Sequence, residues 1–165
     1  AFPLKMRKIK KDEIKEIANK YLELVNLKKF EKNKPYELSG GMRQRASLAR
    51  VLVNSPRMIL MDEPLGALDA LTREHMQKLI RNIWSKTDNT VLLITHDVDE
   101  ALTLATRVIV MSNRPGKIVK SFSLGFTNDI LNENNEEIRY SPQYIKYREE
   151  ILSIINSYDE EVNTL

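Results

Sequence analysis

Three apolar runs separated by helical stretches predict an α/β fold for this chain. The runs are Met58–Met61, Val91–Thr95 and Val108–Met111, and runs of this kind are typical of strands buried on both faces of a parallel sheet. Helical stretches at about residues 70–86 and 97–105 separate them. The order strand, helix, strand, helix, strand is a βαβ series, which indicates an α/β layer.

Two helices are expected before the first apolar run. Apolar residues at three- and four-residue spacing predict an amphipathic helix from Lys11 to Leu27, with Asp12 as its cap. Residues 28–37 are polar and are expected to form a loop. The same spacing predicts a second helix over Met42–Val53, which Asn54-Ser55-Pro56 ends.

The C-terminal part is expected to contain one more strand and one more helix. Arg114–Lys117 has the composition of a turn, and it leads into a short strand at Ile118–Phe122. Residues 126–140 are polar and rich in Asn and Glu, which predicts a linker. Apolar residues at helical spacing then predict a helix over Pro142–Tyr158.

Length and composition exclude several classes of protein. The 165 residues suffice for one domain with a core, and 42% hydrophobic with 30% charged residues is ordinary for a globular chain. The chain has no Cys, which excludes a disulfide framework and a Cys-based zinc site. No apolar run approaches the roughly 20 residues that span a bilayer. The first residue is Ala1, which fits either a piece of a longer protein or removal of an initiator Met.

Charge is distributed unevenly along the chain. Residues 1–34 hold 11 Lys/Arg against 5 Asp/Glu, and residues 126–165 hold 3 against 9. A basic segment can bind nucleic acid or a membrane surface. Because acids are interspersed on a helical pattern here, a solvated helix face is the preferred interpretation, and no nucleic-acid partner is expected.

Two adjacent carboxylates follow the first apolar run. Asp62 and Glu63 would lie at the carboxyl end of a buried strand, the edge at which open α/β sheets bind ligands. Asp62 suits Mg²⁺, which prefers oxygen ligands, and Glu63 could polarise a water. The alternative is a strand that simply ends in polar residues.

Two further features point to phosphate chemistry. His96 directly follows the second apolar run and could hydrogen-bond a phosphate or a water, although a structural role is the commoner one for a lone His. Ser39-Gly40-Gly41 precedes a helix, whose free backbone N–H groups and positive dipole end can bind an anion. Taken alone, that tripeptide would be a flexible turn. No role is assigned to His75.

The combination of these motifs is more specific than any one of them. Leu38-Ser39-Gly40-Gly41-Met42, Asp62-Glu63-Pro64, Gly66-Ala67-Leu68-Asp69 and Thr95-His96-Asp97 occur in this order at tight spacing. In this order and spacing the chain resembles the ATP-binding cassette (ABC) ATPase family over about residues 1–122. The resemblance implies that ATP and Mg²⁺ are the cofactors.

The resemblance also implies roles for individual residues. Asp62 matches the acid that holds Mg²⁺, Glu63 the acid that positions or deprotonates the attacking water, and His96 the switch histidine that contacts the γ-phosphate. The D-loop at the dimer interface would be Gly66, Ala67, Leu68 and Asp69. The signature motif, which binds ATP held by the other subunit, would be Ser39, Gly40, Gly41 and Met42.

The implied fold is part of an ABC nucleotide-binding domain. Residues 1–56 would be the helical subdomain with the signature motif, residues 57–125 the C-terminal part of the P-loop NTPase parallel-sheet core, and residues 126–165 a linker and C-terminal helix. The implied partners are a second ATPase subunit in a head-to-tail dimer and an integral-membrane permease. The implied location is the cytoplasmic face of the bacterial plasma membrane.

The sequence departs from the family pattern at two points. Met42 stands where the signature usually has Gln, and a small effect is expected because the Ser and Gly positions bind the anion. No G-x-x-x-x-G-K-[ST] phosphate-binding loop occurs in the 165 residues. Truncation is the expected explanation, and the 165 residues alone are expected to give no Mg-ATP hydrolysis above background.

The branch of the family is a finer prediction. Residues 62–69 and 95–101 resemble bacterial importer ATPases, and Met111–Ile118 is similar to the nitrate/sulfonate/taurine branch. Another importer branch and an inactive remnant are the alternatives. A DNA-repair ABC ATPase is disfavoured because the chain lacks the sustained heptads of a coiled coil.

Overall fold

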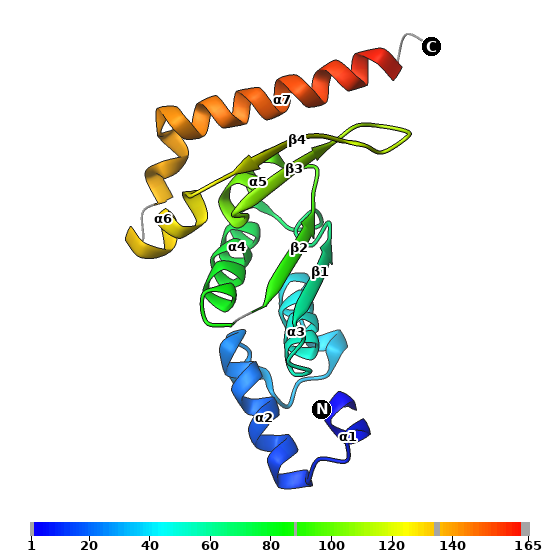
Figure 1. Cartoon of the computed structure of the whole chain (residues 1–165). Helices are drawn as coiled ribbons and strands as arrows, with labels where there is room; N and C mark the ends of the chain where they lie inside the picture. Colours follow the sequence, from blue (N-terminus) through cyan, green and yellow to red (C-terminus); the bar gives the residue numbers. More distant parts are fainter. Residues whose placement is uncertain (1, 88, 134–135, 163–165) are drawn as a thin grey trace. The chain divides into compact units, whose positions relative to one another are not determined.

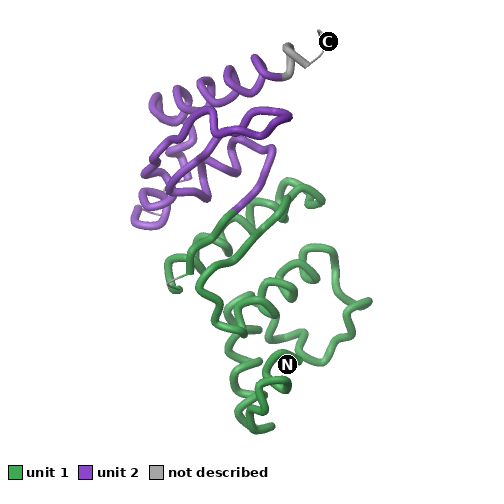
Figure 2. The backbone as a smooth tube through the Cα atoms, turned by 45° about the vertical axis from the view of Figure 1, so that its right-hand side comes forward, with its two compact units in different colours: residues 1–92 green, residues 93–165 purple. Residues whose placement is uncertain are grey.

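The computed structural model describes residues 2–87, 89–133 and 136–162 of the chain. It divides into two compact units, residues 1–92 and residues 93–165 (Figure 2). The boundary falls within strand β2, Thr90–Ile94. The three-part division at residues 56 and 125 follows the motifs rather than these units, and it stays a prediction.

The first unit begins with helices, as expected (Figure 1). Helix α2, Lys11–Leu24, packs on α3, and its buried Ile14 joins Leu4 and Val53 in a small core. The prediction of Asp12 as the cap is wrong: the N-cap is Lys10, which makes no side-chain capping bond, and Asp12 lies in the first turn. The remaining helical segments are α1 Phe2–Met6, η1 Lys28–Phe30, η2 Pro35–Glu37 and α3 Gly40–Leu52, so the expected loop at 28–37 contains two short 3₁₀ turns.

Strands β1 and β2 form a two-stranded sheet and are connected through α4. Strand β1 is Met58–Asp62 and α4 is Ala70–Trp84. The expectation that both faces of these strands are buried is wrong for the described residues. Leu60 is 71% exposed and Ile94 56% exposed, whereas Ile59 is 4% exposed. Successive side chains point to opposite faces of a strand, and only one face is packed here.

The second unit has its own two-stranded sheet. Helix α5, Val98–Leu104, leads to β3, Arg107–Met111, which pairs antiparallel with β4, Ile118–Ser123. Three helical segments follow: α6 Phe126–Glu133, η3 Glu136–Tyr140 and α7 Pro142–Val162. Helices α5 and α7 contact each other, and α5 also contacts α6.

The expected linker at residues 126–140 is instead largely helical over its described part. Phe126, Thr127 and Ile130 of α6 are buried, and Phe126 packs against the ring of Tyr144 at 5.1 Å between centroids. Burial of these few side chains stabilises helix α6. The mostly polar composition of the segment gives no sign of this contribution. Residues 134–135 lie outside the described part of the chain.

A single apolar core holds the second unit together. It combines side chains from α5, both strands, α6 and α7: Val98, Leu102, Val108, Val110, Phe122, Leu124, Phe126, Tyr144 and Ile151. In the part of the chain that the structure describes, no helix has the length and apolar character to cross a bilayer.

Candidate functional site

The acidic turn after β1 has an unusual backbone. Asp62 is the last residue of the strand, and Glu63 follows it with φ of 48°, in the left-handed region that residues other than Gly rarely adopt. The N–H of Gly66 donates to the carbonyl of Glu63 at 3.4 Å and closes the turn. Both carboxylates are exposed. Backbone outliers of this kind cost free energy and cluster at functional sites, so the conformation supports a functional role for this turn.

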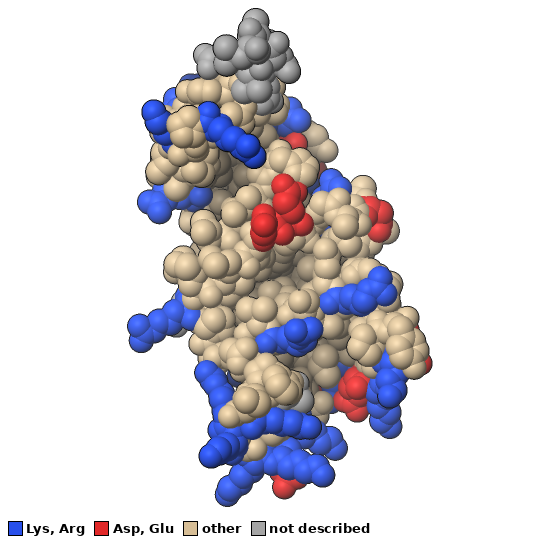
Figure 3. Space-filling model, turned by 90° about the vertical axis from the view of Figure 1, so that its right-hand side faces the viewer, with Lys and Arg blue, Asp and Glu red and all other residues tan. Residues whose placement is uncertain are grey.

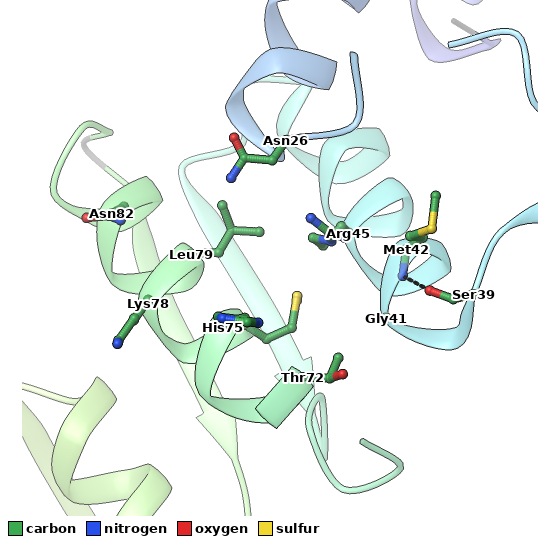
Figure 4. A pocket seen from close by; sticks show the side chains of 11 residues that line it. Asn26, Ser39, Gly41, Met42, Arg45, Thr72, His75, Lys78, Leu79 and Asn82 are labelled. Atoms are coloured by element: carbon green, nitrogen blue, oxygen red, sulfur yellow. Dashed lines mark hydrogen bonds between the residues drawn. The ribbon is translucent and has the colours of Figure 1, made fainter. Parts of the chain in front are cut away.

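The Gly pair of the signature segment has two separate uses. Ser39 is the N-cap of α3, and its Oγ accepts a hydrogen bond from the N–H of Met42 at 3.3 Å (Figure 4). A Cβ on Gly40 would meet nothing within 4 Å, so this residue leaves the helix N-terminus open to a ligand. A Cβ on Gly41 would lie 2.6 Å from Cγ2 of Thr72, so Gly41 allows α3 to approach α4.

A glutamine links the signature helix to the acidic turn. Nε2 of Gln44, on the second turn of α3, donates to the carbonyl of Pro64 at 2.7 Å. Pro64 directly follows Glu63, so the structure connects two of the predicted motifs through one hydrogen bond. Sequence reasoning missed Gln44, and its position two residues after Met42 was the only available signal.

The D-loop segment ends in a helix cap. Oδ1 of Asp69 accepts from the N–H of Thr72 at 3.0 Å and caps α4. This hydrogen bond lowers the pKa of the Asp69 carboxyl below its usual range. Leu65 and Leu68 are buried beneath the segment, while Gly66 and Ala67 are exposed. The segment is therefore anchored by two buried leucines and exposes mainly backbone at Gly66 and Ala67.

The predicted histidine belongs to the second unit. His96 is exposed and lies between β2 and α5. The N–H of Asp97 donates to Oγ1 of Thr95 at 3.0 Å, and Oδ1 of Asp97 accepts from the N–H of Glu100 at 3.0 Å. The turn that carries His96 is thus attached to the first turn of α5.

A pocket of about 360 Å³ lies between α3 and α4 beside the signature segment (Figure 4). It is lined on one side by Ser39, Gly41, Met42 and Arg45, and on the other by α4 residues that include Thr72, His75 and Lys78. His75, to which the sequence assigned no role, therefore faces a cavity next to a predicted motif.

The residues present fit Mg²⁺ held mainly by water and phosphate. Within residues 2–87, 89–133 and 136–162, no cluster of three or more acidic or His side chains could form a protein cage for a metal. Mg²⁺ usually keeps several waters and uses one or two carboxylates together with phosphate oxygens. An exposed Asp62 at the end of β1 suits that type of coordination.

Comparison with known proteins gives one family. The ABC transporter family profile matches residues 2–66. A taurine import ATP-binding protein, TauB, of Pelagibacter ubique is 47% identical over 161 residues, which are 98% of this chain and 61% of that protein. TauB of Jannaschia sp. is 50% identical over 141 residues, which are 86% of this chain and 53% of the relative. The chain therefore spans little more than half of these relatives.

Solved structures agree with the sequence comparison. The ADP conformation of MJ1267, an ATP-binding cassette of an ABC transporter, superposes with a TM-score of 0.64 at 27% identity. The match covers 83% of this chain and 50% of the solved chain. The predicted fold class, a partial ABC nucleotide-binding domain of the P-loop NTPase type, is confirmed.

Proposed function

We propose, because this chain belongs to the ABC transporter family of ATP-binding proteins, that it is part of the ATP-hydrolysing subunit of a bacterial importer. The observation that carries the proposal is the link within the first unit between the signature helix and the acidic turn. Gln44 of α3 donates a hydrogen bond to the carbonyl of Pro64. Pro64 follows Glu63, whose backbone has a left-handed conformation. One hydrogen bond thereby joins the helix that follows the signature segment to the backbone residue after the candidate catalytic Glu63.

The residues of the chain divide the work of phosphoryl transfer. Asp62 would hold Mg²⁺, which supplies charge stabilisation on the phosphates when bound. Glu63 would position or deprotonate the attacking water, and His96 would hydrogen-bond the γ-phosphate. The catalytic assignments rest on the family motifs, the exposure of these side chains and the strained turn.

The signature segment would act on ATP bound by a second ATPase subunit. The Met42 N–H of α3 is bound by Ser39, and the open space at Gly40 lets a phosphate approach the N–H groups of Gly40 and Gly41, which have no partner within the helix. In a two-fold head-to-tail dimer, each subunit lends this segment to the other. The exposed part of the D-loop, Gly66 and Ala67, would lie at the same interface.

The transported solute we propose is taurine or a related sulfonate. The support is the name of the relatives, each of which is a taurine import ATP-binding protein, together with their 47% and 50% identity. The permease of such an importer is an integral-membrane partner, so the subunit would lie at the cytoplasmic face of the plasma membrane.

The basic N-terminal segment is the proposed contact with that permease and its membrane. Residues 1–34 hold 11 Lys/Arg against 5 Asp/Glu, and Figure 3 shows Lys and Arg side chains gathered in the part of the view where α1 and α2 lie. Such a surface also favours an anionic leaflet. Pull-down from membranes with the permease should recover more of the protein than pull-down from permease-free membranes, and equal recovery would contradict the proposal.

The decisive experiment uses the gene product that contains these residues, assembled with its permease. Glu63→Gln should lower ATP hydrolysis by roughly 100-fold or more while ATP binding persists, because a general base contributes factors of that size. Glu150→Gln, which alters a pair with Lys120 outside both the motifs and residues 1–34, is the matched control and should leave turnover unchanged.

Uptake measurements test the solute. Cells lacking the gene should lose uptake of labelled taurine, and the wild-type gene but not the Glu63→Gln gene should restore it. Hydrolysis without taurine-dependent uptake would indicate another importer branch. A wild-type protein without hydrolysis would indicate an inactive remnant and would reject the proposed activity.

A further inference from the structure

Helix α5 determines where the His96 turn lies within the second unit. Asp97 is both the residue after His96 and the N-cap of α5, through its bond from the N–H of Glu100 at 3.0 Å. The N–H of Asp97 is in turn bound to Thr95 on the other side of His96. Two hydrogen bonds therefore fix the backbone on both sides of His96 to the start of α5.

The first turn of α5 carries an acid that is bound by the C-terminal helix. Oη of Tyr144 donates to Oδ1 of Asp99 at 2.9 Å. Nε of Arg148 lies 3.1 Å from Oδ1 and 3.0 Å from Oδ2 of the same carboxylate. Tyr144 and Arg148 are four residues apart on α7 and so lie on one face of that helix. Two side chains of α7 thus converge on one carboxylate of α5.

The geometry of this cluster is anchored by packing. The Tyr144 side chain is 1% exposed, and its ring packs against that of Phe126 at 5.1 Å between centroids. Burial, and secondarily the Asp99 charge, raises the pKa of the Tyr144 phenol, so the phenol remains a hydrogen-bond donor around neutral pH. The hydrogen bond to Asp99 likewise raises the pKa of Arg148. Both donors to Asp99 therefore keep their protons around neutral pH.

We propose that Tyr144 and Arg148 are positioning residues that act through Asp99 and α5 to hold His96 in place for ATP hydrolysis. The inference rests on the proposed ATPase function, and it gives the C-terminal helix a role in that site. The Tyr144 contact is the buried part of this restraint, because the Arg148 and Asp99 side chains are 45% and 43% exposed and exposed ion pairs contribute little free energy.

The test measures ATP hydrolysis by the complete gene product assembled with its permease. Tyr144→Phe removes only the hydroxyl, and Arg148→Gln replaces the guanidinium, whose Nε binds Asp99, by a shorter neutral amide. Tyr144→Phe should lower kcat by about fivefold, the effect of losing part of a charged hydrogen bond, and leave the KM for ATP unchanged. Arg148→Gln should act in the same direction with a smaller loss, because its pair with Asp99 is exposed. Glu150→Gln is the matched control, because Glu150 lies on the same helix but pairs with Lys120 of β4 instead of with α5. It should leave kcat unchanged.

A second background separates positioning from general destabilisation. In His96→Ala protein, single-turnover rates should no longer respond to Tyr144→Phe, because the group that the cluster positions is gone. The same fivefold loss in both backgrounds would show that the cluster acts on the fold and would overturn the proposal. So would a kcat for Tyr144→Phe equal to that of the wild type.

The two proposals fail in distinguishable ways. If the wild-type assembly hydrolyses no ATP, the proposed function itself is wrong. If the wild type is active, Glu63→Gln is inactive and neither α7 variant differs from Glu150→Gln, then the positioning role alone is wrong. Thermal unfolding of each variant confirms that the protein measured is folded.

Discussion

The two compact units hold their candidate functional residues by different means. In residues 1–92, the restraints are steric and close to the backbone: Gly41 allows α3 to approach Thr72, and Gln44 binds a main-chain carbonyl. In residues 93–165, side chains of α7 reach back more than 40 residues to Asp99. The restraints of the first unit are thus a missing side chain at Gly41 and one amide that binds the backbone, whereas the second unit depends on two side chains of a distant helix that converge on one carboxylate.

The strands themselves are packed alike in the two units. Both sets expose apolar side chains, such as Leu60 at 71% in β1 and Ile118 at 66% in β4. The second unit surrounds Leu102, which is fully buried, with side chains from every one of its major elements. Substitutions should therefore act through close backbone approach in the first unit and through buried polar contacts in the second.

The largest effect is expected where a methyl group is added to the first unit. Gly41→Ala places a Cβ 2.6 Å from Cγ2 of Thr72, a β-branched side chain that has little rotameric freedom in a helix. Overpacking of this kind lowers the free energy of unfolding by about 2 kcal/mol. Urea denaturation of the complete protein measures the change.

The neighbouring glycine and the neighbouring methyl group supply the controls. Gly40→Ala adds the same atom where nothing lies within 4 Å, so it should not destabilise the fold. Thr72→Ser removes the clashing Cγ2 and should recover most of the stability that Gly41→Ala loses. Equal losses for the two glycine variants would contradict the steric explanation.

The signature pair shows how much sequence can predict about a site. The motifs predicted Ser39, Gly40 and Gly41 as one anion-binding segment, because their order and spacing resemble a known family. The different roles of the two glycines could be seen only in the structure, because Thr72, which Gly41 approaches, lies 31 positions further along the sequence. The link from Gln44 to Pro64 was missed for the same reason.

The C-terminal region shows the corresponding limit for the fold. The periodic apolar pattern predicted α7 well, but the polar composition of residues 126–140 concealed α6. Helix α6 is stabilised by burying Phe126 and Ile130 against distant elements, and local composition does not encode that burial. Asp12 was a wrong cap prediction because acids are common throughout the first turn of a helix, not only at its N-cap.

An intermediate effect is expected where a buried hydroxyl is removed from the second unit. Thr127 is 1% exposed, and its Oγ1 lies 3.1 Å from the carbonyl of Thr103 and 3.0 Å from that of Ala105. Its one hydroxyl proton is thereby shared between two carbonyls at the C-terminal end of α5, where helix carbonyls lack partners within the helix. Thr127→Val keeps the shape but leaves these groups unbound, which should cost about 1 to 2 kcal/mol.

Hydrogen exchange resolves where that loss occurs. The amides of α5 should lose protection in Thr127→Val, while Thr127→Ser, which keeps the hydroxyl, should retain most of it. If Thr127→Val keeps as much protection as Thr127→Ser, the second unit does not depend on this polar contact.

The smallest effect concerns the cap of α4 in the first unit and depends on pH. The hydrogen bond from Thr72 lowers the pKa of Asp69 in the folded protein below the value of about 3.9 in an unfolded chain. A folded pKa below the unfolded one contributes stability that is present above about pH 4 and is lost as the pH falls through the folded pKa.

Asp69→Asn retains a capping oxygen that does not titrate, and Asp69→Ala retains none. Urea denaturation at pH 5 and pH 3 should therefore show the wild type losing its advantage over Asn at the lower pH, with Ala the least stable of the three at pH 5. A constant difference between wild type and Asn at the two pH values would show that the carboxylate charge does not stabilise this helix, and that the first unit holds its motifs by shape and backbone contacts alone.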